Sequence, residues 1–153
     1  MKTRVGYFSK FGNTRQIAEA IAGVFAAAGE AQAVSFEQLR AAHLNDADVV
    51  IMGCPTYRMN LPEPVRLKLA ALPKGVLRGK SVAAFDTSYQ LSAFLAHFTA
   101  AGRLAGKLRK LKGKSIARGE TFLVVGREGP LCEGEAERAR AWAATLLEKT
   151  SQG

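Results

Sequence analysis

Short apolar runs alternate along the chain with longer segments in which apolar residues recur every three or four positions. The apolar runs predict buried strands at 5–8, 31–35, 48–53, 80–85 and 121–126. The helical spacing predicts helices at 14–28, 37–42, from Pro62 or Pro64 onward, 92–111 and 135–148. Strands that alternate with helices predict an α/β fold with a parallel sheet and right-handed crossovers.

The chain of 153 residues, 48% of them hydrophobic, fits one domain with a real core, spanning 1–153. We expect a five-stranded parallel sheet of order 2-1-3-4-5 with helices on both faces. That order places the second, third and fourth helices on one face. The first and last helices lie on the other.

The net charge of +9 is unevenly distributed. Residues 64–119 carry twelve basic residues and one acid, Asp86, whereas the remainder carries ten basic and twelve acidic residues. Such a segment suggests an anionic partner: an acidic protein, a nucleic acid or a charged small ligand. The alternative is a solvated basic surface without a dedicated partner.

Several function classes find no support in the sequence. No apolar run approaches the roughly 18 residues of a membrane-spanning helix, and the start has no signal-peptide core, so we expect a cytoplasmic protein. Cys54 and Cys132 are too few for a disulfide framework and are expected to be free thiols. The stretch 75–81 (GVLRGKS) has the wrong glycine spacing for a nucleotide P-loop, and no G-x-G-x-x-G occurs.

The turn after the first predicted strand concentrates polar residues: Ser9, Lys10, Gly12, Asn13 and Thr14. The first N–H groups of a helix have no partner within it, and the helix dipole adds about half a positive charge. A phosphate fits such a place, with glycine allowing close approach of the backbone. The alternative is a polar turn that only caps the helix.

Three stretches resemble the flavodoxin-like family of FMN-binding proteins. "SKFGNT" (9–14) resembles the family's phosphate loop, commonly T/S-x-T-G-N-T. "GCPTYRMNLP" (53–62) resembles the loop that covers one side of the flavin, and "FDTSYQ" (85–90) stands where another loop covers the other side. The resemblance extends over essentially the whole chain, and it implies a flavodoxin-like three-layer sandwich with a five-stranded parallel sheet of order 2-1-3-4-5 and FMN as cofactor.

The resemblance also implies the cofactor-binding residues. The phosphate-loop positions are Ser9, Lys10, Phe11, Gly12, Asn13 and Thr14. One flavin face would be lined by Pro55, Thr56, Tyr57 and Arg58, and the other by Thr87, Ser88 and Tyr89. The two tyrosines offer aromatic faces for stacking.

Two departures from the family pattern shape the functional hypotheses. Phe11 stands where the family has a second hydroxyl, which removes one phosphate hydrogen bond. The chain is also basic, whereas classical flavodoxins are acidic, so like charges would repel the usual basic-faced reductase. We therefore expect a different redox partner protein, itself acidic. Nucleic acid is not expected, because aromatic residues do not interleave with the basic ones.

The leading hypothesis is an FMN protein that carries electrons or acts as a small flavin-dependent reductase. The rival is a binding module on the same fold that has lost flavin and docks an acidic partner through its basic face. The sequence leaves the oligomeric state and the electron donor open. Of the remaining candidates, Cys54 and Trp142 are expected in the core, and Asp86 either contacts ligand or caps the following turn, with the cap favoured.

Overall fold

The structure, a computed structural model, describes residues 1–57, 60–89 and 99–152. Within these ranges the elements are, in order, β1 (Lys2–Tyr7), α1 (Asn13–Ala26), β2 (Glu30–Ser35), α2 (Ala41–Asn45), β3 (Val49–Pro55), α3 (Glu63–Ala71), β4 (Ser81–Tyr89), α4 (Ala100–Lys110), β5 (Lys114–Ser115), β6 (Glu120–Val124) and α5 (Glu135–Gln152). The predicted alternation of strands and helices is confirmed. None of the helices in these ranges is both long and apolar enough to cross a membrane.

The strands form one parallel sheet of order β2-β1-β3-β4-β5, with β6 also paired to β4. The predicted order 2-1-3-4-5 is confirmed, and its fifth position is shared by two short strands. β5 pairs with the first two residues of β4, and β6 pairs with the last five. The sequence predicted only the second of these strands, because a two-residue strand of Lys114 and Ser115 leaves no hydrophobic pattern.

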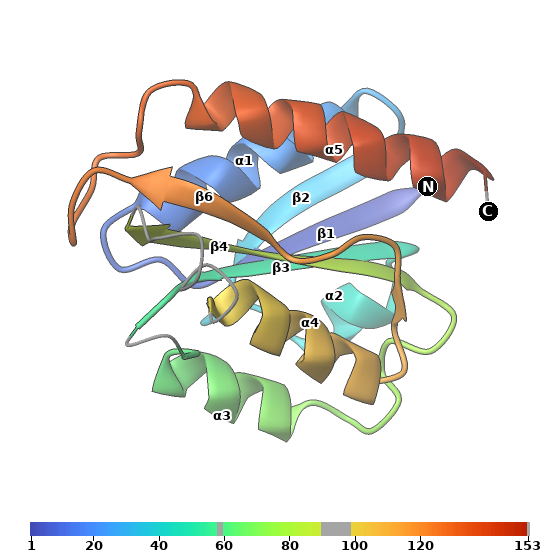
Figure 1. Ribbon diagram of the computed structural model, residues 1–153. Helices are drawn as coiled ribbons and strands as arrows, with labels where there is room; N and C mark the ends of the chain where they lie inside the picture. The colour runs from blue at the N-terminus through green and yellow to red at the C-terminus, as the bar shows by residue number, and fades with distance from the viewer. Residues whose placement is uncertain (58–59, 90–98, 153) are drawn as a thin grey trace.

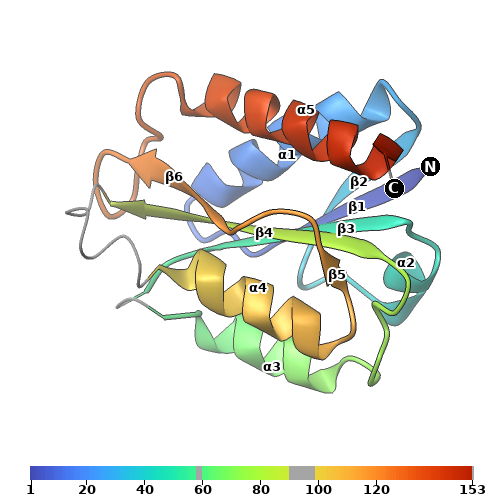
Figure 2. The same ribbon diagram turned by 45° about the vertical axis from the view of Figure 1, so that its right-hand side comes forward.

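Helices cover both faces of the sheet. Figures 1 and 2 show α1 and α5 on one side and α2, α3 and α4 on the other. Each layer has its own buried cluster: one contains Ile17, Ile21 and Phe122, and the other contains Leu69 and Leu104. Six of the seven residues of β3 are buried, as expected for a central parallel strand.

The second helix lies later in the chain than predicted. The sequence predicts it at 37–42, but α2 covers Ala41–Asn45 after a turn. Arg40 is extended at the helix start, and its N–H donates to Nδ1 of His43 at 2.9 Å. Leu39, which precedes the helix, and Leu44, which lies within it, are both fully buried. The wrong boundary arose because a buried leucine just outside so short a helix resembles part of its apolar face.

The fourth strand is longer than predicted. It continues past Phe85 to Tyr89, because residues 85–89 pair with β6 in register, Thr87 opposite Phe122 and Tyr89 opposite Val124. Thr87, Ser88 and Tyr89 are therefore strand residues, and the prediction that they form a loop is wrong. Their largely polar side chains concealed the continuation of the strand.

The remaining helices differ from the predictions mainly at their ends. Of the helix predicted at 92–111, the structure describes the part that forms α4, Ala100–Lys110. Residues 92–98 lie outside the described residues. Pro62 precedes α3 and Pro64 lies in its first turn, as proline at a helix start should. In α5, Trp142 is only half-buried, and its ring packs edge-to-face against Phe85 and Phe122.

Candidate functional site

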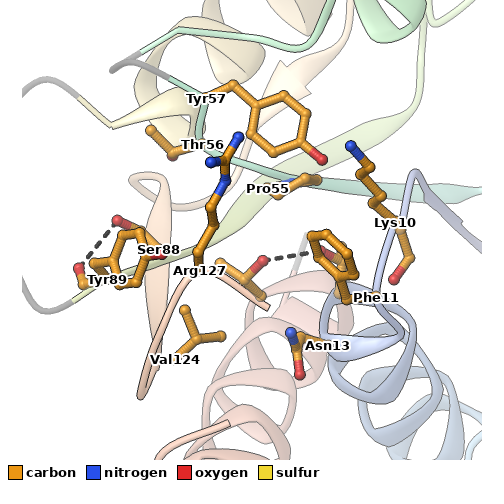
Figure 3. A pocket seen from close by; sticks show the side chains of 13 residues that line it. Lys10, Phe11, Asn13, Pro55, Thr56, Tyr57, Ser88, Tyr89, Val124 and Arg127 are labelled. Carbon is orange, nitrogen blue, oxygen red and sulfur yellow. Dashed lines mark hydrogen bonds between the residues drawn. The ribbon is translucent and has the colours of Figure 1, made fainter. Parts of the chain in front are cut away.

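A pocket of about 590 Å³ opens where β1, β3 and β4 end at the carboxyl edge of the sheet. Eleven of the thirteen residues predicted from the sequence line it: Ser9, Lys10, Phe11, Asn13, Thr14, Pro55, Thr56, Tyr57, Thr87, Ser88 and Tyr89. The fold thus brings three separate segments to one cavity, as ligand sites at the strand ends of parallel sheets require. Figure 3 shows the side chains around it.

Two of the predicted residues are not among the pocket lining. Gly12 lies behind the loop, where it borders a separate shallow cavity with Arg15 and Gln38. Arg58 lies outside the described residues. Gly12 still shapes the site, because its φ of 92° is left-handed and it forms the N-cap of α1.

The loop before α1 presents unpaired backbone donors. The hydroxyl of Ser9 accepts the N–H groups of Gly12 and Arg15, at 3.0 and 3.3 Å, and so holds the turn closed. The N–H groups of Asn13 and Thr14, the first two of α1, have no acceptor within the described part of the chain. They carry the positive end of the helix dipole, so an anion placed there is stabilised.

Side chains of the loop tie the start of α1 to the rest of the site. The hydroxyl oxygens of Thr14 and Thr87 are 2.9 Å apart and hydrogen-bonded, which joins α1 to β4. The amide of Asn13 donates to the carbonyl oxygen of Glu128 at 3.1 Å. The loop after β6 is therefore fixed against the phosphate-loop positions.

Aromatic residues stand around the mouth of the pocket. Phe11 and Tyr89 are each 43% exposed and Tyr57 is 36% exposed. Figure 3 shows Tyr89 on the opposite side of the view from Phe11, with the side chain of Arg127 extending between them toward Tyr57. Tyr57 and Asn60 exchange backbone hydrogen bonds of 3.1 and 2.9 Å, which tie the backbone of the tyrosine to that of Asn60.

Val124 and Arg127 line the pocket but were missed from the sequence. Val124 ends β6, and Arg127 follows in the loop that Asn13 holds. The "GREG" stretch was available as a signal, because polar residues after the last parallel strand share the edge of the sheet at which the other sites lie. Within the described residues, Lys10 and Arg127 are the charged side chains of the pocket, and both are positive.

Asp86 is fully buried immediately beneath the pocket. Its Oδ2 accepts the hydroxyl hydrogen of Thr56, whose Oγ1 accepts the N–H of Ala100 at 2.9 Å. Burial raises the pKa of Asp86 to about 6, opposed chiefly by the hydrogen bond from the Thr56 hydroxyl. Asp86 therefore supports a pocket residue and the start of α4 from the core, and does not reach the cavity itself.

The other ionisable groups near the pocket are not arranged for acid–base or nucleophilic chemistry. Burial, and then the charge of Asp86, raises the pKa of the Cys54 thiol well above its usual range, so the thiol is inert. Burial is also the main cause of the raised pKa of Tyr57. No group of three metal-binding side chains occurs among the described residues. The arrangement is suited to binding a planar anionic ligand.

Comparisons with known proteins agree with this geometry. The family model described as flavodoxin matches residues 5–142. The chain belongs to the flavodoxin family. Membership implies FMN as the cofactor and an electron-transfer role. A search of the curated proteins finds no match.

Solved structures show the same fold at low identity. An archaeal flavodoxin is 23% identical, with 99% of each chain covered and a TM-score of 0.76. A WrbA-like flavodoxin from Agrobacterium tumefaciens is 22% identical, with 99% of this chain and 98% of that one covered and a TM-score of 0.79. The flavodiiron protein from Giardia intestinalis is 20% identical; 97% of this chain matches 36% of it, with a TM-score of 0.76.

Proposed function

We propose that the pocket binds FMN and that the protein carries electrons between partners or acts as a small FMN-dependent reductase. The observation that carries the proposal is the pair of unpaired N–H groups, on Asn13 and Thr14, at the edge of a cavity of about 590 Å³. A pocket of that volume accommodates a cofactor-sized ligand. The flavin would supply the redox chemistry when bound.

The loop at the start of α1 would hold the phosphate. The backbone amides of Asn13 and Thr14 would donate to it, and the side chain of Lys10 would add a positive charge. Phe11 cannot donate a hydrogen bond, but the Lys10 ammonium lies 5.5 Å from the centre of its ring, so a charge is close to the lost donor. The residues present therefore fit a phosphate monoester.

The walls of the pocket would hold the ring system. Tyr57 follows β3 and Tyr89 ends β4, so the two rings reach the pocket from different segments, and both would offer a face for offset stacking. The backbone of Thr56 is fixed to β4, since its N–H donates to the carbonyl oxygen of Thr87 at 3.0 Å. These residues would orient the ring and exclude water from it.

Titration of purified protein with FMN tests the proposal. Binding should quench flavin fluorescence. Asn13→Ala and Thr14→Ala keep the backbone donors but remove the side-chain hydrogen bonds to Glu128 and Thr87 that hold the loop in place, so each should weaken binding by about 0.5–1.5 kcal/mol. Asn45→Ala and Thr145→Ala change exposed residues of the same types away from the pocket and should leave the affinity unchanged. An unchanged FMN signal on adding the wild-type protein would reject flavin binding.

A second candidate function is a flavin-free binding module that docks an acidic partner. Phe11 favours it, because its half-exposed ring occupies the pocket mouth where the family pattern has a hydroxyl. The absence of quenching would favour this alternative. We further propose a redox partner protein with an acidic face and a cytoplasmic location for the flavin-binding form.

A further inference from the structure

A second cavity, of about 580 Å³, lies between the C-terminal ends of α3 and α4. Its basic side chains, here called the basic groove, are Arg66, Lys74, Arg78, Lys107, Lys110 and Lys112. All six are exposed, none forms an ion pair within the described part of the chain, and no acid lines the cavity there. The C-terminal dipoles of two helices offset only about one of these six charges.

Side chains from two segments meet over Gly75 in the groove. The guanidinium Nη2 of Arg78 lies 3.4 Å from the position that a Cβ on Gly75 would occupy, and Cγ of Lys112 lies 3.8 Å from it. The Arg78 guanidinium and the aliphatic stem of Lys112 therefore lie over the same glycine, and no acid lines this cavity among the described residues. The basic side chains of such a cavity repel one another, and a bound anion relieves the repulsion.

The backbone at Lys112 gives a second and independent observation. Lys112 has a φ of 76° and is the only non-glycine residue of positive φ among the described residues. It ends α4 in a Schellman motif: its N–H donates to the carbonyl oxygen of Arg109 at 2.9 Å, and that of Gly113 donates to Leu108 at 3.1 Å. Glycine is the usual residue at this position, so a lysine keeps its side chain in the groove at a cost in backbone strain.

The floor of the groove is apolar. Leu69 is buried, Leu72 and Leu111 are half-buried, and Ala70 is exposed; all four line the cavity together with the basic residues. Nucleic-acid backbone or inorganic polyphosphate would match the charge but not the floor. A peptide in which carboxylates alternate with apolar side chains would match both.

We propose that the basic groove binds an acidic segment of a partner protein that carries apolar side chains among its carboxylates. The groove lies at the opposite end of the sheet from the flavin pocket. α3 and α4 run against the strands, so their C-terminal ends lie where the strands begin (Figures 1 and 2). A segment bound there leaves the pocket open, and its binding does not depend on FMN.

The test uses the full ¹⁵N-labelled chain and an acetylated twelve-residue peptide of alternating Glu-Glu and Leu-Leu pairs. Chemical shifts should change mainly at Ala70, Gly75 and Lys112, equally with and without FMN. Replacing the peptide's leucines by serine at constant charge should weaken binding at least fivefold. Ala70→Glu should abolish it, whereas Ala144→Glu, which adds the same charge to an exposed alanine of α5, should weaken it less than twofold.

Two double variants that remove the same amount of charge distinguish binding at the groove from non-specific electrostatic attraction of the peptide to the protein. Lys110→Gln with Lys112→Gln should weaken the peptide at least tenfold, whereas Arg118→Gln with Arg140→Gln, which are also exposed but lie outside the groove, should weaken it less than twofold. Equal losses in both variants would overturn the proposal. Equal or tighter binding of the serine peptide or of a twelve-nucleotide oligothymidylate would overturn it too. Failure to bind FMN would not affect either result.

Discussion

The buried carboxylate of Asp86 gives a prediction that can be worked through quantitatively. It is fully buried, its Oδ1 has no hydrogen-bond partner among the described residues, and its Oδ2 accepts the Thr56 hydroxyl. The folded protein thus keeps a charged carboxylate buried away from water at neutral pH, with one of its oxygens unpaired among the described residues. The substitution Asp86→Asn removes the charge at nearly constant volume and keeps one acceptor for Thr56.

The sign and size of the effect follow from the pKa. Burial raises the pKa of Asp86 from 3.8 to about 6, so the folded state binds the proton more tightly than the unfolded state. The stability that this group contributes is then fully present below pH 3.8 and is lost as the pH rises through about 6. The full loss is about 3 kcal/mol, of which about 2 kcal/mol falls between roughly pH 4.5 and 7.5.

Urea denaturation of the wild type and of Asp86→Asn at several pH values between about 4.5 and 7.5 measures this loss of stability. The variant should gain about 2 kcal/mol relative to the wild type across that range, whatever its absolute stability. Glu37→Gln, at an exposed acid in a turn, serves as the control and should run parallel to the wild type. A constant difference between Asp86→Asn and the wild type across the range would refute the assigned burial effect.

Three further predictions concern packing, the ion pair of the buried Glu135 and the flavin. Gly53→Ala should destabilise the protein by about 1–3 kcal/mol in urea denaturation, because the added Cβ would overlap the ring of Phe85, whereas Gly23→Ala has open space in mid-helix and should stabilise by up to about 1 kcal/mol. Glu135→Gln should lower the free energy of unfolding by about 1.5–3 kcal/mol at pH 7, because Arg138 holds the pKa of the Glu135 carboxyl below 4.5. The difference from the wild type should shrink as the pH falls through the pKa of Glu135 in the folded protein. A difference that does not change with pH would contradict the assignment. In the FMN-loaded protein, the second one-electron reduction should occur at a less negative potential than in acidic flavodoxins, since the fully reduced flavin is anionic. Arg127→Gln should lower that potential by roughly 40 mV in a redox titration, as expected for a loss of about 1 kcal/mol, and an unchanged potential would show that this arginine does not act on the flavin.

The strands with continuous apolar runs could be predicted because burial on both faces leaves little choice of residue. β3 and the apolar part of β4 belong to this group. The sheet order was expected from the resemblance to the flavodoxin-like family, because right-handed crossovers fix the hand of each connection and leave the order of the strands open. The phosphate-loop positions could be found because a parallel sheet places the turn between a buried strand and an amphipathic helix at its ligand-binding edge. Polar residues and a glycine gathered in that turn therefore indicate an anion site.

The predictions that failed concern segments whose positions are fixed by contacts with residues distant in sequence. Thr87 to Tyr89 became strand because β6 supplies hydrogen bonds from more than thirty residues away, and no local pattern of polar residues records that pairing. Arg127 lines the pocket because the side chain of Asn13 donates to the neighbouring carbonyl oxygen of Glu128 and so holds the loop in place. α2 is too short for periodicity to define its ends, and its capping by His43 was not foreseen.

The excess of basic residues in the sequence is not gathered around the flavin pocket in the fold. The cations of 64–119 that line the basic groove lie at the amino end of the sheet, roughly a strand length from the pocket. A seven-residue strand spans about 23 Å, more than twice the screening length of about 10 Å at roughly 0.1 M salt. Those charges therefore have little influence on a flavin, and the potential should depend on Lys10 and Arg127 instead. The two groups should be separable by substitution: Lys110→Gln with Lys112→Gln should weaken peptide binding at the groove but leave the flavin potential unchanged, whereas Arg127→Gln should lower that potential.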